Sequence, residues 1–258
     1  MKERIITGIC LLAVILPLVY VGGYSFMGLI LVATAMATYE MLAMHDTLTI
    51  VPVEVKFFAI IATLGIAFSL TLSMAWWVLC VHSIFLILDY YVFKKINVET
   101  GLFYTKTLIY IGLSFKALLA IRYHSLSLFI FLIATVILTD SMAYFAGRFF
   151  GKHKLAPKIS PKKTIEGAIG GWLVGASFAV GFGLVTELFA QMWILVVLAI
   201  FLPILSQIGD LVASALKRQY GIKDFGNMFP GHGGVMDRVD SQMLAAILIY
   251  VIILFGSV

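Results

Sequence analysis

Three aspartates near the end of the chain have the residue type and spacing of a magnesium site. Asp237 and Asp240 lie one helical turn apart where the last apolar run begins, and Asp210 lies within the run before it. Neighbouring helices could therefore bring three carboxylates to one hollow. Such oxygen ligands suit Mg²⁺, which keeps coordination positions for waters and substrate phosphates, so we expect this ion, alone or with a second metal ion. Capping of a helix would use only one of the two neighbouring acids.

Asp210 belongs to a polar stripe on an otherwise apolar helix. The stripe consists of residues spaced four, four and three apart, namely Ser206, Asp210, Ser214 and Lys217. Asp210 should lie roughly 10 Å below the end of this helix, since each residue adds about 1.5 Å. A carboxylate at that depth needs a cation or water around it, which makes it a candidate site residue. A structural ion pair with a neighbouring lysine is the alternative interpretation.

A second acid, Asp140, lies in the apolar run 126–149. Because this run should pass from the outside to the cytoplasm, Asp140 is expected within roughly 10 to 15 Å of the cytoplasmic end, at about the depth of Asp210. Gly147 and Gly151 continue the face of Asp140 and would let a helix or a ligand come close. For the glycines, ordinary helix packing is the alternative.

The loop after this run is strongly basic. Its lysines are Lys152, Lys154, Lys158, Lys162 and Lys163, with Pro157 and Pro161 expected to keep parts of the loop extended. Thr164 follows as a candidate N-cap of the next helix. The N-terminus of a helix beside clustered lysines is a favourable binding site for phosphates. The alternative is that the lysines only attract anionic lipid head groups.

The stretch KDFGNMFPGHGGVMDRVDS, residues 223–241, combines acids, bases and glycines. Gly233 and Gly234 would let backbone N–H groups approach a ligand. His232 could donate a hydrogen bond to phosphate or shape the loop. Carboxylates that hold Mg²⁺, surrounded by lysines and a glycine loop, indicate phosphoryl or nucleotidyl transfer. A site buried below the head groups implies that one substrate is a lipid.

Composition shows which elements must position these residues. The chain has 258 residues, of which 62% are hydrophobic and 12% charged, whereas a soluble domain carries about a quarter charged residues. We therefore expect an all-α polytopic membrane protein, with residues 1–258 forming a single integral membrane domain. Apolar runs long enough to cross a bilayer occur at about 5–21, 24–43, 56–73, 75–93, 104–121, 126–149, 166–187, 190–216 and 240–256.

Nine spans would place the two ends of the chain on opposite sides of the membrane. With the N-terminus in the cytoplasm and the C-terminus outside, all of the 18 lysines and arginines except Lys116 and Arg122 fall on the cytoplasmic side. This distribution predicts that the site faces the cytoplasm. The membrane is expected to be a bacterial inner, or plasma, membrane.

The segment SALKRQYGIKDFGNMFPGHGGVMDRVD, residues 214–240, resembles the signature of the phosphatidate cytidylyltransferase, or CDP-diacylglycerol synthase, family. The signature positions are filled by Ser214, Lys217, Arg218, Lys223, Asp224, Gly226, Phe229, Pro230, His232, Gly233, Gly234, Asp237, Arg238 and Asp240. Residues 140–167 similarly resemble an earlier conserved region of that family. The resemblance covers the C-terminal half, so we expect residues 123–258 to be catalytic and 1–122 to be a scaffold with lipid and dimer contacts.

The resemblance implies that CTP and phosphatidic acid give CDP-diacylglycerol and pyrophosphate, with Mg²⁺, in a membrane-embedded homodimer. The expected partners are these substrates and the lipid bilayer, and no nucleic acid. Asp210, Asp237 and Asp240 would hold the metal. The same resemblance implies catalytic roles for Asp140, Ser214 and Lys217, and substrate or phosphate contacts from Arg218, Lys223, Asp224, His232, Gly233, Gly234, Arg238, Lys162, Lys163 and Thr164.

Two other functions fit parts of the pattern. A secondary transporter also buries acids in its helices, but its site usually lies near the midplane between internal repeats, whereas the polar residues here gather toward one face. Another Mg²⁺-dependent lipid phosphotransferase, such as a CDP-alcohol phosphatidyltransferase, would carry a DG…AR…G…D…D motif. We do not find this motif in the sequence.

Overall fold

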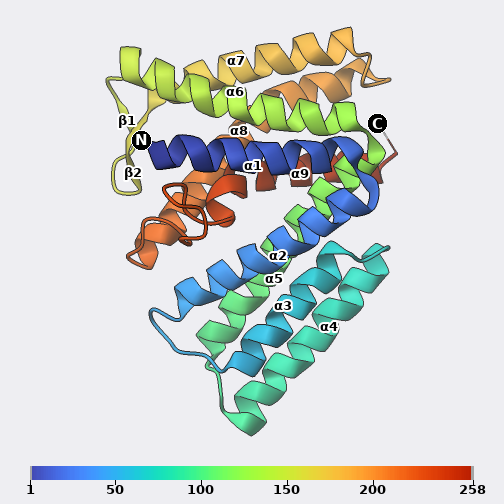
Figure 1. Cartoon of the computed structure of the whole chain (residues 1–258), viewed down its shortest axis with the longest axis vertical. Helices are drawn as coiled ribbons and strands as arrows, with labels where there is room; N and C mark the ends of the chain where they lie inside the picture. The colour runs from blue at the N-terminus through green and yellow to red at the C-terminus, as the bar shows by residue number, and fades with distance from the viewer. Residues whose placement is uncertain (1, 257–258) are drawn as a thin grey trace. The chain divides into compact units, whose positions relative to one another are not determined.

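The computed structural model describes residues 2–256 and is built almost entirely from helices (Figure 1). The helices are α1 (Lys2–Val21), α2 (Gly23–His45), α3 (Val53–Ala67), α4 (Leu72–Leu88), the π-helical η1 (Asp89–Phe93), α5 (Val98–His124), α6 (Leu126–Phe150), α7 (Ile165–Val185), α8 (Met192–Gln219) and α9 (Met236–Leu254). Two short strands, β1 (Lys154–Ala156) and β2 (Ser160–Thr164), form the one sheet of the described chain.

Six helices of the described chain are long and apolar enough to cross a bilayer: α2, α4 with η1, α5, α6, α7 and α8. Many of their large apolar side chains are exposed, for example Trp76 and Trp77 at 67% and 71%. Such surfaces are suited to lipid. The protein is therefore an all-α membrane protein, as expected. Helices α1, α3 and α9 overlap the remaining apolar runs but lie outside this set, so the count of nine spans stays a prediction.

The limits of several helices follow from local capping. The Ser125 side chain accepts hydrogen bonds from the backbone at the start of α6, and the Thr164 hydroxyl accepts one from Gly167 N at 3.1 Å at the start of α7. These contacts satisfy N–H groups that have no acceptor within their own helix. The N-cap predicted at Thr164 is confirmed.

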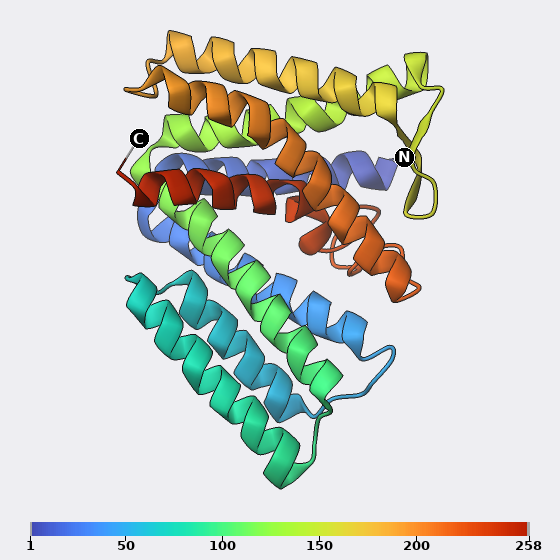
Figure 2. The same ribbon diagram turned by 180° about the vertical axis from the view of Figure 1, so that it is seen from behind.

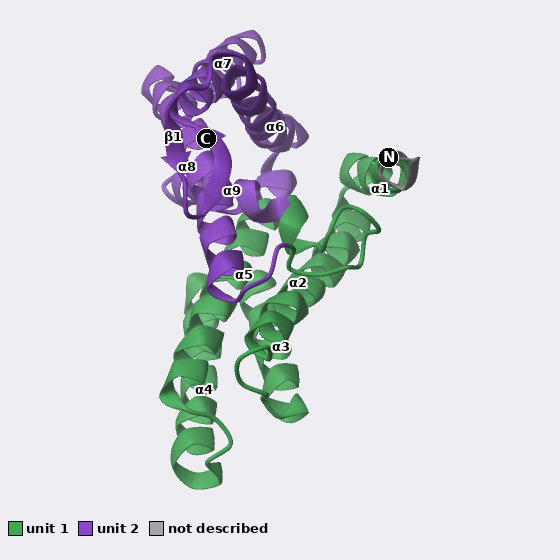
Figure 3. Ribbon diagram, turned by 90° about the vertical axis from the view of Figure 1, so that its left-hand side faces the viewer, with its two compact units in different colours: residues 1–119, 224–238 green, residues 120–223, 239–258 purple. Residues whose placement is uncertain are grey.

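The described residues fall into two compact units (Figure 3). The first contains the chain up to residue 119 together with residues 224–238, and the second contains residues 120–223 and those from 239 onward. In the first unit, helices α2 to α5 surround a core that includes Leu42, Val55 and Tyr104. Helices α3 and α4 lie side by side in both the front and rear views (Figures 1 and 2).

The second unit is organised around the small face of α7. Its buried positions recur every fourth residue, at Gly167, Gly171, Gly175, Ala179 and Gly183. A Cβ added at Gly171 would stand 2.6 Å from the carbonyl oxygen of Thr139, on α6. One added at Gly175 would stand 3.1 Å from the ring of Pro203, on α8. The absence of side chains on this face therefore lets α6 and α8 pack closely against α7.

The basic loop between α6 and α7 is a hairpin and not merely an extended loop. Strands β1 and β2 pair antiparallel, with Lys154 opposite Thr164 and Ala156 opposite Ser160. These strands were not predicted, because lysines and prolines replace the alternating apolar residues that would indicate a strand. The pairing is possible because the last turn of α6 lies close in space to the first turn of α7, so that the connecting segment must reverse direction.

Candidate active site

The hairpin and helices α6, α7 and α8 line a cavity of about 500 Å³ in the second unit. Among its lining residues are the acids Asp140 and Asp210 and the cations Arg148, Lys154, Lys162 and Lys163. The structure thus brings together the two acids that the sequence placed at similar depth, and it adds the predicted basic loop. Tyr144, Arg148 and Gln207 line the cavity as well, and they were not predicted as site residues.

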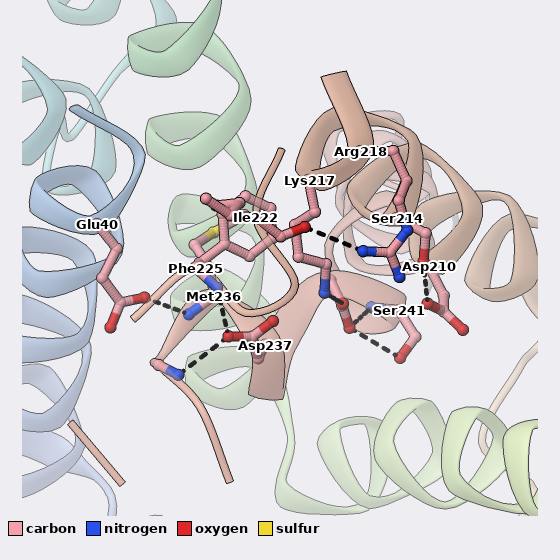
Figure 4. A network of polar contacts seen from close by, with 12 residues as sticks. Glu40, Asp210, Ser214, Lys217, Arg218, Ile222, Phe225, Met236, Asp237 and Ser241 are labelled. Carbon is pink, nitrogen blue, oxygen red and sulfur yellow. Dashed lines mark hydrogen bonds and ion pairs between the residues drawn. The ribbon is translucent and has the colours of Figure 1, made fainter. Parts of the chain in front are cut away.

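Asp210 is held by residues from two different segments. Its Oδ2 lies 2.6 Å from Nζ of Lys163, on β2, and its Oδ1 accepts a hydrogen bond from the Ser214 hydroxyl at 3.3 Å (Figure 4). About 30% of each charged side chain remains exposed. The ion pair foreseen as an alternative therefore exists, but its lysine comes from the hairpin that lines the cavity. Lys163 can therefore form an ion pair with Asp210 and also contact a ligand in the cavity.

A second pair of opposite charges lies where α8 and α9 meet. Nζ of Lys217 stands 3.9 Å from Oδ2 of Asp240, and both side chains are about nine-tenths buried. Oδ1 of Asp240 accepts a hydrogen bond from the backbone N–H of Ser241 at 2.8 Å. The hydroxyl of Ser241 also donates to this Oδ1, at 3.5 Å. The close approach is possible at Gly209, where a Cβ would stand 2.6 Å from the Asp240 carbonyl oxygen.

Asp237 closes the glycine-rich loop of the first unit. Its Oδ2 accepts hydrogen bonds from Phe225 N at 2.8 Å and from Gly234 N at 3.0 Å (Figure 4). Gly231 and Gly233 have φ angles of 72° and 81°, which side chains rarely adopt. The loop amide at Gly234 is therefore occupied by the protein's own carboxylate.

The remaining predicted residues of residues 214–240 have these surroundings, each within its own unit. Arg218 donates to the carbonyl oxygen of Ile222 at 3.0 Å. The ring of His232 faces Gly8 of α1, within the first unit. Three further residues of the predicted set are exposed, namely Lys223, Asp224 and Arg238.

The cavity contains two carboxylates, which are ligands of the type that Mg²⁺ prefers. Asp140 and Asp210 both line this cavity, and the hydroxyl of Ser214 hydrogen-bonds Asp210. Within the described residues, no three or more histidine, cysteine, aspartate or glutamate side chains are grouped so that they could hold a metal. Mg²⁺ typically uses only one or two protein carboxylates and completes its shell with waters and substrate phosphates. The trio of Asp210, Asp237 and Asp240 stays a prediction.

The hairpin is anchored by an acid that was not predicted as a functional residue. Glu166, on the first turn of α7, accepts hydrogen bonds from Lys152 N and His153 N, and its Oε1 lies 2.6 Å from Nδ1 of His153. The signal was present in the sequence, as an acid two residues after the N-cap Thr164. Glu166 therefore connects residues 152 and 153, just before β1, to the first turn of α7 by hydrogen bonds.

Glu166→Ala is expected to loosen the hairpin without unfolding the protein. Removal of the carboxylate leaves two backbone N–H groups without their acceptor, so trypsin should cleave after the hairpin lysines severalfold faster, and activity should fall with it. Glu187→Ala, which removes an exposed acid from the connection between α7 and α8, is the matched control. Equal cleavage rates in the two variants would contradict the anchoring role.

Comparisons with known proteins agree over the whole chain. The sequence model of the cytidylyltransferase family matches residues 2–255. A protein named phosphatidate cytidylyltransferase from Bacillus subtilis (strain 168) is 35% identical over 280 residues, which cover 100% of this chain and 99% of that protein. Proteins of the same name from Staphylococcus saprophyticus and Staphylococcus haemolyticus are each 34% identical, over 98% of this chain and 99% of their own lengths. The similarity thus includes the first ~120 residues, which contain none of the motifs that resemble the family.

Proposed function

The chain belongs to the cytidylyltransferase family, and we propose that it is a phosphatidate cytidylyltransferase of a bacterial plasma membrane. It converts CTP and phosphatidic acid to CDP-diacylglycerol and pyrophosphate in phospholipid biosynthesis. The observation that carries this function is the full-length similarity to curated enzymes of that name. A transporter or another lipid phosphotransferase is not favoured by it.

The cavity of the second unit has the chemistry that this reaction needs. Its volume of about 500 Å³ is within the range of sites for small ligands. In the reaction, a phosphate oxygen of phosphatidic acid attacks the α-phosphorus of CTP, and the bond to the pyrophosphate oxygen breaks. The lipid phosphate is already ionised near neutral pH, so no side chain has to act as nucleophile. Catalysis then depends on positioning and on neutralising charge.

The cations of the cavity are suited to bind the phosphates. Lys162 and Lys154 line it from the hairpin, and Arg148 lines it from the end of α6. Lys163, which lines the cavity, and Lys217 each lie near a carboxylate, so they offset the negative charge of Asp210 and Asp240 while no phosphate is bound. Arg218, Lys223 and Arg238 are proposed as further phosphate contacts on the strength of the family resemblance.

Mg²⁺ is proposed as the cofactor, with a second metal ion as an extension of the same proposal. Asp210, which lines the cavity, would hold it together with Asp237 and Asp240, which are assigned to it by their spacing in the sequence. Once bound, the ion would supply positive charge that offsets the charge developing on the triphosphate. Asp140 and Ser214 would orient ligands or waters at the same site.

The topology and assembly are part of the proposal. Nine spans, with the N-terminus in the cytoplasm and the C-terminus outside, are supported by the distribution of lysines and arginines. This arrangement turns the basic hairpin and the site toward the cytoplasm, where CTP is available. A homodimer is proposed on the family resemblance, with the helices of residues 1–122 as the scaffold that contacts lipid and the second subunit.

One assay tests the proposed function. Purified protein in detergent is incubated with Mg²⁺, phosphatidic acid and each nucleoside triphosphate in turn, and both the lipid product and pyrophosphate are measured. CDP-diacylglycerol and pyrophosphate should appear in equal amounts with CTP. Consumption of a cytidine nucleotide without pyrophosphate would instead indicate a phosphatidyltransferase. Uptake by proteoliposomes without any nucleotide would indicate a transporter.

A further inference from the structure

A buried acid of α2 binds the backbone at the start of α9, within the first unit. Oε1 of Glu40 accepts a hydrogen bond from Val235 N at 2.8 Å. Oε2 accepts one from Met236 N at 2.9 Å (Figure 4). Glu40 is only 6% exposed and lies 195 residues before Val235 in the chain. It was not predicted as a functional residue, although it is the only acid in the apolar run 24–43.

These hydrogen bonds are placed where a helix needs them. The first N–H groups of a helix have no acceptor within the helix, and a negative charge near them is favourable. Met236 is the first residue of α9, and Val235 directly precedes it. Most helices meet this need with a side chain of a neighbouring residue. In this chain α9 depends for it on a carboxylate from another helix.

The position of Glu40 also explains two glycines of the loop. A Cβ added at Gly234 would stand 2.3 Å from Oε1 of Glu40, and one added at Gly226 would stand 2.8 Å from the same atom. Neither glycine is among the residues with positive φ, so the backbone conformation would accept alanine at both positions. The carboxylate of Glu40 is therefore what excludes a side chain there.

We propose that Glu40 is a positioning residue for the segment 224–238, and this inference rests on the proposed function. Its carboxylate is the fixed acceptor around which the loop folds, and it sets the start of α9, where Asp237 and Asp240 follow within one turn. It touches neither substrate nor reacting atoms. Because this helix start already has its own carboxylate, the substrate phosphates are bound by the lysines and arginines and not by the amides at 235 and 236.

Glu40→Ala tests the proposal with a readout that a packing role would not change. The variant removes the acceptor and leaves a small space beside two N–H groups. We expect turnover to fall roughly 10-fold to 100-fold, as for other residues that orient a metal-binding group. Added formate should restore part of the activity in a saturable manner, because it returns a carboxylate to that space. Formamide, which has a similar size and no charge, should not.

A double-mutant cycle tests the same contact independently of rescue. Gly226→Ala should be harmful in the parent protein, where the new Cβ meets Glu40, and nearly harmless in the Glu40→Ala background. Glu54→Ala is the matched control, because Glu54 is an exposed acid on the first turn of α3, also in the first unit. Its turnover should equal that of the parent.

Hydrogen exchange at Val235 and Met236 separates this inference from the proposed function, because it requires no activity. Exchange should accelerate in Glu40→Ala and slow again with formate. If Glu40→Ala does not accumulate as folded protein, Glu40→Gln, which keeps the size of the side chain, is used for the exchange measurement. Unchanged exchange, equal rescue by formamide and formate, or additive effects of the two alanine substitutions would each overturn the role of Glu40. An inactive parent protein would overturn only the proposed function.

Discussion

Asp240→Asn is expected to lower the turnover of CTP and phosphatidic acid by at least ~100-fold in protein that remains folded. Asparagine keeps the shape of the side chain and removes its charge. Its carbonyl oxygen can still accept the hydrogen bond from Ser241 N that Oδ1 of Asp240 accepts in the structure. The loss therefore reports the missing charge opposite Lys217 and at the proposed metal position. Raising the Mg²⁺ concentration should recover part of the activity, because a weakened metal site is still a site.

Asp237→Asn is expected to show the same loss for the same reason. One carbonyl oxygen can still accept from both Phe225 N and Gly234 N, as Oδ2 does, so the loop should keep its shape. If these acids only cap α9, asparagine serves nearly as well, and the cost should be about 1 kcal/mol of stability with turnover intact. Turnover within a few-fold of the parent across a Mg²⁺ titration would refute the metal assignment for the residue concerned.

Asp46→Asn is the control for both substitutions. Asp46 forms an ion pair with Lys56 in the first unit, so its replacement also breaks a contact between a lysine and a carboxylate. It has no place in the proposed site, and turnover per folded molecule should stay near that of the parent. A loss as large as that of Asp240→Asn would show that breaking any such pair is sufficient, and the assignment of Asp240 would fail.

The double substitution of Lys162 and Lys163 by alanine is expected to have the second large effect, of about 100-fold or more in turnover or in the apparent affinity for CTP. Both lysines line the cavity, and Lys163 also neutralises Asp210 at 2.6 Å. Removal of the pair takes away phosphate contacts and leaves Asp210 without its counter-ion. The apparent affinity for CTP should respond more strongly to salt in the parent than in the variant, because exposed charges are screened.

The matched control is the double substitution of Lys94 and Lys95 by alanine. This pair carries the same charge, but it lies after η1 in the first unit, where Lys95 approaches Glu54 at 3.8 Å and the ring of Phe93. These lysines are expected to set the orientation of the chain and not to bind substrate. If both double substitutions lower the activity equally, at matched expression and salt, the proposal that the hairpin contacts substrate is wrong.

Much of the architecture could be predicted because its causes are local. The run 126–149 forms α6, and the run predicted at 166–187 forms α7, because apolar composition and a capping hydroxyl act within a few residues. The hairpin between them could not be predicted from its own residues. Its strands are short and charged, and they pair because the glycine face of α7 brings the end of α6 to the start of α7.

The sequence by itself determined that the protein is an all-α membrane protein, that acids lie inside its apolar helices, and that its C-terminal half carries a cytidylyltransferase signature. Only the tertiary structure decided which groups meet: Lys163 with Asp210, Lys217 with Asp240, and Glu40 with the start of α9. The physical reason is the distance along the chain over which each interaction acts. Helical periodicity and capping act within one or two turns, whereas these contacts join segments far apart in the chain and depend on how side chains of different helices pack together.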